Sequence, residues 1–283
     1  MNYFLYNPSA NNGNAIVRIN EIRTELADQN IKEINLLEFK AYATFVQNLT
    51  PHDKIYLAGG DGTLNRFVNA IDCENLKNDI YYYAVGTGND FLHDLEVDDM
   101  KKCVKINHYV RHLPVVTVNG ESYKFFNGIG YGIDGYCCEE GDKQRAKNKK
   151  KINYTAIAMK GLMGKFKPRK CTINIDGFVK NYKDVWLAPT MLGRYYGGGM
   201  KVTPDQYRDN NEHVVSLAVM FGSGKIKTLT RFPNIFSGKH VRFKDMVEIF
   251  KGHNVNVKFD EPCALQVDGE TFLNVSEYSV TYN

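Results

Sequence analysis

The segment from Lys54 to Asn69 constrains the fold of this 283-residue chain more than any other stretch. Its sequence, KIYLAGGDGTLNRFVN, runs from a short apolar strand through a glycine-rich turn into apolar residues at helical spacing. Unpaired N–H groups and the positive end of the helix dipole converge at such a turn, and glycine lets a phosphate approach the backbone. Asp61 would repel a bare phosphate, which favours a metal ion or a hydroxyl group beside it. We expect an anion site here; the alternative is a tight turn that binds no ligand.

A second glycine turn and an early loop repeat this pattern. The strand expected at 80–85 leads into GTGNDF at 86–91, and the strand expected at 2–6 leads into Asn7-Pro8-Ser9. Loops that follow the strands of a doubly wound α/β layer meet at one edge of its sheet. We therefore expect these loops to contribute to one site.

Taken together, the motifs GGDGT-LNRFVN and GTGNDF resemble the nucleotide loops of the diacylglycerol kinase catalytic-domain family, lipid kinases that include the sphingosine and ceramide kinases. NAD kinases share the GGDGT core but do not carry GTGNDF in this form. The resemblance implies ATP and Mg²⁺ as cofactors, with Asp61 near the metal at the β- and γ-phosphates. The residues that it implies for nucleotide binding are Asn7, Pro8, Ser9, Gly59, Gly60, Asp61, Gly62, Thr63, Asn65, Gly86, Thr87, Asn89 and Asp90.

The sequence changes character after Leu113, where short strands are separated by hairpin turns such as Asn119-Gly120. The GxGxxG pattern at 130–135 is a weak dinucleotide signal, because residues 137–140 offer no good helix start and no βαβ unit follows. With the resemblance, this predicts an α/β domain followed by an all-β domain. We expect a three-layer, doubly wound, NAD kinase-like domain at 1–110 and a β-sandwich domain at 111–283, with the active site in the cleft between them.

The stretch ALQVDGE, at 264–270, carries the expected catalytic acids. Leu265 and Val267 indicate a strand that ends in the turn Asp268-Gly269-Glu270. VDGE resembles the C-terminal signature of the lipid kinases, which supplies their general base. We expect Asp268, Glu270 and Asp61 to be catalytic, and the sequence does not say which of the first two is the base. The alternative is a surface Asp-Gly turn.

A second magnesium site is suggested by residues 197–211, which resemble the family's GGGM…P…DDG segment around a structural magnesium ion. Here Asp209-Asn210-Asn211 replaces Asp-Asp-Gly, and the loss of a carboxylate weakens a site for a hard cation. Asp61, Asp209 and Asn210 are thus the expected metal ligands, and the occupancy of the 209–211 loop stays open.

The charge distribution is uneven, since residues 143–170 contain nine Lys, two Arg and no acid. This favours an anionic membrane surface as partner, or a solvated loop. Nucleic acid is not expected, because no recognition motif accompanies the charge. No apolar run approaches the roughly 18 residues of a membrane span. No signal peptide and no cysteine spacing for a metal are present, so we expect a reduced cytoplasmic protein that associates peripherally with the inner face of the membrane.

These observations predict an ATP-dependent lipid kinase that phosphorylates a primary hydroxyl group, converting diacylglycerol to phosphatidic acid. One alternative is a kinase of a soluble alcohol, as in NAD kinase. Another is a nucleotide- or lipid-binding relative with weakened catalysis. The sequence does not name the lipid, and it leaves the oligomeric state open, a homodimer being one arrangement to test.

Overall fold

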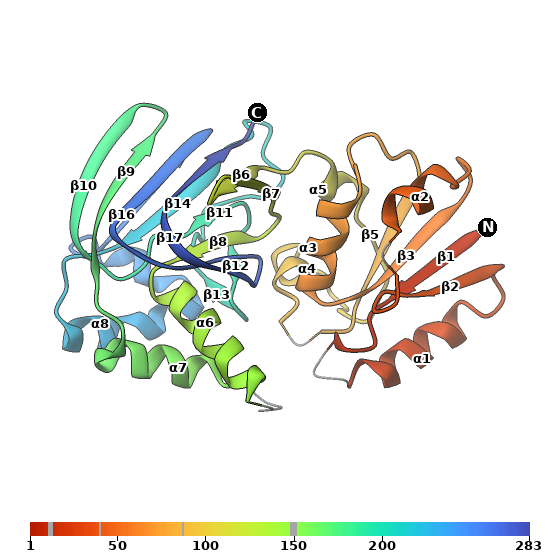
Figure 1. The fold of residues 1–283 in the computed structure, drawn as a ribbon, viewed down its shortest axis with the longest axis horizontal. Coiled ribbons are helices and arrows are strands. Elements are labelled where there is room, and N and C mark those ends of the chain that lie inside the picture. The colour runs from red at the N-terminus through yellow and green to blue at the C-terminus, as the bar shows by residue number, and fades with distance from the viewer. Residues whose placement is uncertain (11–13, 40, 87, 148–151) are drawn as a thin grey trace. The chain divides into compact units, whose positions relative to one another are not determined.

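The structure is a computed structural model that describes residues 1–10, 14–39, 41–86, 88–147 and 152–283. The chain divides into two units, Met1–Leu113 and Pro114–Asn283 (Figure 1). No helix within the described residues is both long enough and apolar enough to cross a membrane.

The N-terminal unit is built on a five-stranded sheet with the order β2-β1-β3-β4-β5. Neighbours among the first four strands run parallel, and β5 is antiparallel to β4. The strands are β1 (Asn2–Tyr6), β2 (Ile31–Asn35), β3 (Lys54–Gly59), β4 (Asp79–Ala84) and β5 (Val104–Lys105). The helices are α1 (Ala15–Glu25), α2 (Tyr42–Gln47), α3 (Asp61–Ala70), α4 (Asp90–Asp94) and α5 (Asn107–Arg111).

The central strand β3 is buried on both faces, which explains its nearly continuous apolar sequence, whereas the edge strand β2 is partly exposed. On one face, Ile19 and Ile22 of α1 pack against Phe4 and Tyr56. On the other, the ring of Tyr82 contacts Phe91 of α4 edge to face. The strand after β1 lies on one side of it, and the following strand, β3, lies on its other side. The strand order therefore reverses between β1 and β3. Ligands bind at the carboxyl ends of the strands beside such a reversal.

The C-terminal unit is dominated by β-structure, with a ten-stranded sheet among the described residues and a separate β12–β13 pair. Its strands are β6 (Val115–Val118), β7 (Glu121–Lys124), β8 (Gly128–Tyr131), β9 (Arg169–Ile175), β10 (Phe178–Val185), β11 (Thr190–Met191), β12 (Tyr195–Tyr196), β13 (Met200–Lys201), β14 (Val215–Met220), β15 (Val247–Gly252), β16 (Asn254–Val267) and β17 (Glu270–Thr281). Its helices are α6 (Ile133–Ala146), α7 (Tyr154–Lys160) and α8 (Lys225–Arg231), with the π-helical turn η2 (Gly161–Lys165) and the 3₁₀ turns η3 (Phe232–Ser237) and η4 (Lys239–Arg242).

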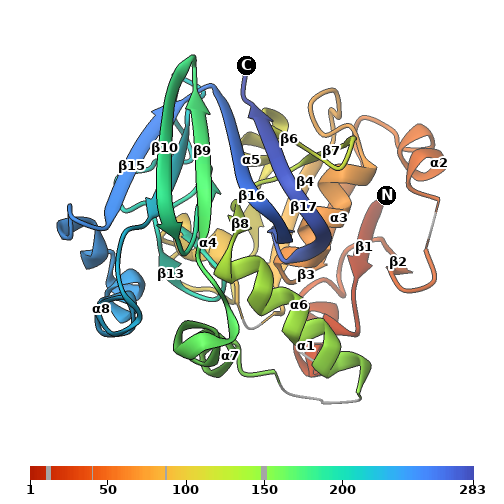
Figure 2. The ribbon, with the colours of Figure 1, turned by 60° about the vertical axis from the view of Figure 1, so that its left-hand side comes forward.

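The long strand β16 has different neighbours along its length. Its first half pairs with β9 and its second half pairs with β8, and the register against β17 shifts between Lys258 and Leu265. Strands that change partners at such a bulge form the corners of sandwiches. In Figure 2, β9 and β10 extend as a long hairpin from this part of the unit.

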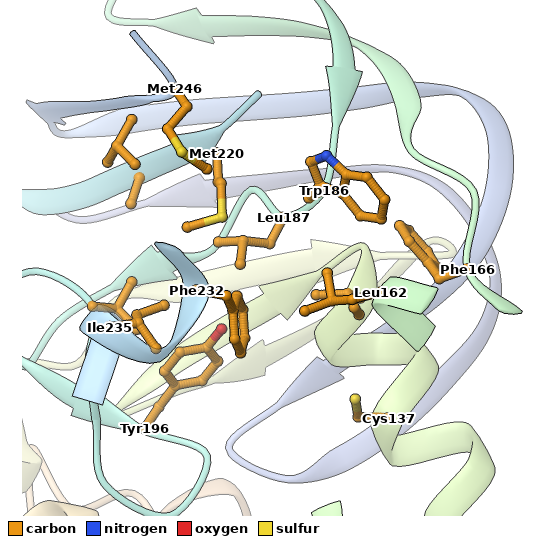
Figure 3. Close-up of a cluster of buried hydrophobic side chains, with 14 of the residues drawn as sticks. Cys137, Leu162, Phe166, Trp186, Leu187, Tyr196, Met220, Phe232, Ile235 and Met246 are labelled. Carbon is orange, nitrogen blue, oxygen red and sulfur yellow. The ribbon is translucent and has the colours of Figure 1, made fainter. Parts of the chain in front are cut away.

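A hydrophobic core joins the helices of this unit to its sheet (Figure 3). Trp186 lies against Phe166, and its indole N–H donates to the carbonyl of Ser223 at 3.1 Å. Leu162 of η2 and Phe232 of η3 belong to the same cluster. The core therefore fixes α7, η2 and α8 on one side of the sheet.

The helix α6 corrects the expectation that no helix would start near residue 137. It begins at Ile133, directly after Gly132, whose φ of +99° favours glycine. A Cβ at Gly135 would lie 1.8 Å from the carbonyl oxygen of Ala264, so glycine lets α6 lie directly on β16. The second and third glycines of the GxGxxG pattern thus serve the turn and the packing, and β8 pairs antiparallel with both of its neighbours among the described strands.

Candidate active site

Two hydrogen bonds join the three expected loops of the N-terminal unit. The Asn7 amide donates from Nδ2 to Oγ1 of Thr63 at 2.9 Å, which links the loop after β1 to the start of α3. The backbone N–H of Asp90 donates to Oδ2 of Asp61 at 2.9 Å, which links the loop after β4 to the same turn. The sequence-expected residues Asn7, Thr63, Asp61 and Asp90 therefore gather at one edge of the sheet.

Glycine is required where two of these loops touch. A Cβ at Gly86 would lie 2.9 Å from the Cα of Gly60, and a Cβ at Gly59 would lie 2.3 Å from the Cβ of Thr63. The N–H of Val85 donates to the carbonyl of Gly59 at 2.9 Å, which holds the two strand ends together. The glycines thus allow the two loops to approach each other directly before the N-terminus of α3.

Asn89 has an unusual conformation in the second glycine turn. Its φ is +38°, in the left-handed region, and its Nδ2 donates to the carbonyl of Gly86 at 3.0 Å. Its Oδ1 is buried, and no other described residue donates a hydrogen bond to it. A buried acceptor of this kind fits a hydroxyl donor from a ligand. Thr87, the neighbouring expected contact, lies outside the described residues.

The remaining expected residues support the loops in different ways. The Asn7 Oδ1 accepts the N–H of Ser9 at 3.0 Å, an Asx turn that shapes the loop containing Pro8. Gly62 lies in the first turn of α3, and Asn65 is buried one turn further on.

Tyr82 is a residue that the sequence analysis missed. Its hydroxyl donates to the carbonyl of Gly59 at 3.0 Å, directly before the glycine turn. Burial, with a smaller contribution from the charge of Asp61, raises the pKa of Tyr82 well above its usual value, so the hydroxyl stays a donor. No local pattern in the sequence marks a strand tyrosine for this task.

In the C-terminal unit, Asp268 and Gly269 form the two-residue turn between β16 and β17. Their φ angles are +45° and +93°, and Val267 pairs with Glu270 across the hairpin. Two successive positive φ values are typical of a type I′ turn, for which Asp-Gly is a favoured sequence. The VDGE sequence therefore forms a hairpin turn.

The carboxylate of Asp268 also joins this turn to the start of β8. Its Oδ2 accepts the N–H of Phe126 at 2.8 Å, and its Oδ1 accepts the N–H groups of Asn127 and Gly128, each at 2.9 Å. In return, the N–H of Asp268 donates to the carbonyl of Gly128 at 3.1 Å. The Asp268 carboxylate thus holds the turn against the start of β8, and three of its acceptor positions are used by backbone donors.

Arg208 completes this arrangement, and the sequence analysis also missed it. The buried guanidinium donates from Nη2 to Oδ1 of Asn127 at 2.8 Å and from Nη1 to the carbonyl of Phe126. The same dipeptide thus binds Asp268 through its N–H groups and Arg208 through its oxygens. Glu270 lies two residues beyond Asp268, half-buried, as the first residue of β17.

Asp134, in the first turn of α6, is a third buried carboxylate of this unit. Burial raises its pKa from 3.8 to about 6, although a hydrogen bond from the Tyr196 hydroxyl opposes this shift. Tyr196 directly precedes the three consecutive glycines at 197–199. A titratable group perturbed in this way is often part of a functional site.

The expected metal ligands fall into both units. Asp61 lies in the glycine turn of the N-terminal unit, whereas Asp209 is exposed on a loop of the C-terminal unit. The neighbouring Asn210 donates from its amide nitrogen to two backbone carbonyls. A metal ligand would instead have to present the amide oxygen to this place.

Two family models match this chain, one in each half. Residues 2–118 match the diacylglycerol kinase catalytic domain, and residues 127–279 match the YegS C-terminal NAD kinase beta sandwich-like domain. A diacylglycerol kinase from Bacillus subtilis (strain 168) is 27% identical over 78% of this chain and 72% of its own length. A diacylglycerol kinase from Staphylococcus carnosus (strain TM300) is 26% identical over 82% of this chain and 76% of its own.

A solved structure of a diacylglycerol kinase from Bacillus anthracis str. Sterne is similar to this one with a TM-score of 0.65, over 99% of this chain and 93% of that one. At 18% identity this likeness shows the fold alone. It confirms the expected combination of an α/β domain and a β-sandwich domain. With the two domain matches, it follows that the chain belongs to the diacylglycerol kinase catalytic-domain family of lipid kinases.

Proposed function

We propose that this protein transfers the γ-phosphoryl group of ATP to the primary hydroxyl group of a membrane lipid, most simply diacylglycerol, to give phosphatidic acid. The observation that carries the proposal is the pair of bonds from Asn7 to Thr63 and from Asp90 to Asp61, which assembles three loops at the N-terminus of α3. The relatives named diacylglycerol kinases support the choice of substrate.

Phosphoryl transfer depends on positioning and on neutralising the charge of the triphosphate. The N–H groups and the positive dipole end of α3 would bind the phosphates. Asn89 Oδ1 would accept a hydrogen bond from a nucleotide hydroxyl. Mg²⁺ usually binds through one or two carboxylates together with substrate phosphates, so the Asp61 carboxylate fits an ion that arrives with ATP. When bound, the ion would polarise the phosphoryl oxygens and neutralise their charge.

The acceptor hydroxyl must lose its proton as the new P–O bond forms, and a carboxylate within hydrogen-bond reach can take that proton. Glu270 is the better candidate for this base, because the Asp268 carboxylate already binds the N–H groups of Phe126, Asn127 and Gly128. Asp268 then acts as a positioning residue, which holds the turn from which Glu270 projects.

We further propose a specific membrane-docking face on the C-terminal unit. Three of the eleven basic residues at 143–170 pair locally: Lys143 with Glu139 and Glu140, Arg145 with Asp142, and Arg169 with Glu261. The lysines at 149–151 lie outside the described residues. Of the described lysines, we assign Lys160 of α7, Lys165 of η2 and the nearby Lys167 to the docking face.

The helix α8 extends this charge and adds apolar side chains. A Cβ at Gly164 of η2 would lie 3.3 Å from Nζ of Lys225, so the two elements are adjacent. Met163 is 61% exposed and Ile226 is 82% exposed. Exposed apolar side chains surrounded by lysines suit an anionic lipid surface. We call this surface the α7–α8 face; it comprises Lys160, Met163, Lys165, Lys167, Lys225 and Ile226.

An assay with radiolabelled ATP tests the proposed reaction. Diacylglycerol, sphingosine and ceramide would be presented in mixed vesicles, with NAD and glycerol as soluble acceptors. We expect labelled lipid product, and Asp61→Asn should abolish it. Label transferred only to a soluble acceptor would favour an NAD kinase-like function, and the absence of any turnover would favour a binding protein.

Vesicle sedimentation tests the docking face separately. Ile226→Glu should weaken binding to vesicles that contain anionic lipid, and raised salt should release the wild-type protein. Val179→Glu, at an exposed apolar position on β10, is the matched control. Equal losses in the two variants, or salt-resistant binding, would contradict the assignment of this face.

A further inference from the structure

The loop between β13 and β14 contains two backbone carbonyls that converge on two side-chain amides. The Asn210 Nδ2 donates to the carbonyl of Tyr207 at 2.7 Å and to that of Val214 at 3.2 Å. The Gln206 Nε2 donates to the same carbonyls, at 3.3 Å for Tyr207 and 2.9 Å for Val214. Each carbonyl thus binds two amide donors. We call the side chains of Gln206 and Asn210 the amide clamp.

Further hydrogen bonds fix the orientation of both amides. The N–H of Val214 donates to Oδ1 of Asn210 at 2.8 Å, so the nitrogen of this side chain must face the carbonyls. The hydroxyl of Ser216 donates to Oε1 of Gln206 at 2.6 Å, inside the protein. Gln206 is 1% exposed and Ser216 is fully buried. Rotating either amide would bring an oxygen against the carbonyls and would leave a buried donor unpaired.

This donor set does not fit a hard cation. Mg²⁺ requires oxygen ligands at about 2.0–2.1 Å, and Ca²⁺ requires six to eight oxygens at about 2.3–2.6 Å. Here the space in front of the two carbonyls is occupied by N–H donors, which would repel a cation. No group of three or more His, Cys, Asp or Glu side chains suited to a metal occurs in the described part of the chain.

We propose that the amide clamp takes the place of the structural metal ion that the resemblance of this loop to GGGM…P…DDG implies. A metal ion in such a loop would hold carbonyl oxygens together by its positive charge. The amide N–H groups of Gln206 and Asn210 hold the carbonyls of Tyr207 and Val214 together in the same way, and they need no ion. The order of this loop is therefore independent of divalent metal.

The clamp has a consequence for the proposed base. Arg208 lies between the two clamp residues in the sequence, and its guanidinium binds the carbonyl of Phe126 and Oδ1 of Asn127. The N–H groups of Phe126 and Asn127 bind Asp268. The clamp thus positions Arg208, which helps to hold the Asp268-Gly269 turn and, after it, Glu270. This consequence rests on the proposed function, whereas the metal independence does not.

Thermal unfolding of the nucleotide-free protein, in EDTA and in millimolar Mg²⁺ or Ca²⁺, tests the clamp without any assay of activity. The midpoint of the wild-type protein should be the same in all three conditions, apart from any rise that Asp61→Asn removes. Asn210→Asp replaces the donor with a carboxylate that faces two carbonyls. Its midpoint should fall in EDTA and should recover when either cation is added.

Two further variants keep the test decisive. Asn211→Asp adds the same charge at the neighbouring exposed position and should show neither effect. Asn210→Ala should lower the midpoint equally with and without metal, which tests the proposal even where Asn210→Asp does not fold.

A metal-dependent rise of the wild-type midpoint that Asn210→Ala removes would overturn the proposal. Stoichiometric metal that wild-type protein retains through dialysis, and that Asn210→Ala loses, would overturn it as well. A rise that persists in Asn210→Ala and is lost in Asp61→Asn comes from the nucleotide loops and supports it.

Discussion

The two units each contain an aspartate in a glycine turn, and the two carboxylates are used differently. Asp61 opens α3, and its Oδ2 binds the N–H of Asp90 from a neighbouring loop. Asp268 opens a hairpin turn, and both of its oxygens bind N–H groups at the start of β8. The first turn is shaped by a close backbone contact between glycines, and the second by buried hydrogen bonds from backbone N–H groups to a carboxylate.

The difference teaches that the fold can use the same residue type in a glycine turn in two ways. Asp268 binds three backbone N–H groups, which is why we propose Glu270, and not Asp268, as the general base. Four predictions test this comparison.

The largest effect is expected for Glu270→Gln. The amide cannot accept the proton of the acceptor hydroxyl, so kcat should fall by about 100- to 10,000-fold. The thermal midpoint should stay close to that of the wild-type protein, because Glu270 opens a strand at a half-buried position. Steady-state kinetics together with thermal unfolding checks both parts. Near-full kcat in this variant would remove Glu270 from the mechanism.

Asp268→Asn should act on stability first. An asparagine offers one oxygen in place of two, and its NH₂ group would face a backbone N–H, so about 2–4 kcal/mol of unfolding free energy should be lost. Urea denaturation measures this change, with Glu121→Gln on the exposed edge of β7 as control. A variant as stable as the wild-type protein but without turnover would return Asp268 to a direct catalytic role.

Asp134 provides a carboxylate whose contribution depends on pH. Because its pKa is raised from 3.8 to about 6, its protonated form contributes stability that is complete below pH 3.8 and is lost as the pH rises through about 6. Asp134→Asn remains neutral and keeps that contribution. Between about pH 4 and about pH 8, the difference in unfolding free energy should therefore shift by up to about 3 kcal/mol in favour of the variant. Denaturation at several pH values checks this sign; a constant difference would contradict the raised pKa.

The smallest effect is expected for Gly86→Ala, which tests the backbone contact of the N-terminal loops. The new Cβ would lie 2.9 Å from the Cα of Gly60, so the loops must separate. We expect a loss of about 1–3 kcal/mol of unfolding free energy, as for other overpacked sites. Gly88→Ala is the matched control for stability, because a Cβ there would meet nothing within 4 Å. Equal midpoints in the two variants would show that the contact contributes little.

The sequence predicted the family and the fold class, and both are confirmed by the domain matches and the similar structure. It also predicted lipid-kinase function in general, whereas the acceptor, the use of ATP and the individual site residues stay predictions. The helix α6 was missed because glycines at 135 and 141 lower helix propensity, whereas its packing on β16 depends on the fold. Tyr82, Gln206 and Arg208 were missed because their partners are remote in the sequence or are backbone atoms.

By itself, the sequence determined the features that depend on local backbone geometry. Glycines at 59, 60 and 86 and the Asp-Gly pair at 268–269 are readable because few other residues allow those contacts or those φ angles. Only the tertiary structure decided which polar groups meet: Asp268 with the N–H groups of 126–128, and the amide of Asn210 with the carbonyls of Tyr207 and Val214. The physical reason is that a turn is specified by its own residues, whereas a hydrogen-bond partner is specified by the fold that brings it within 3 Å.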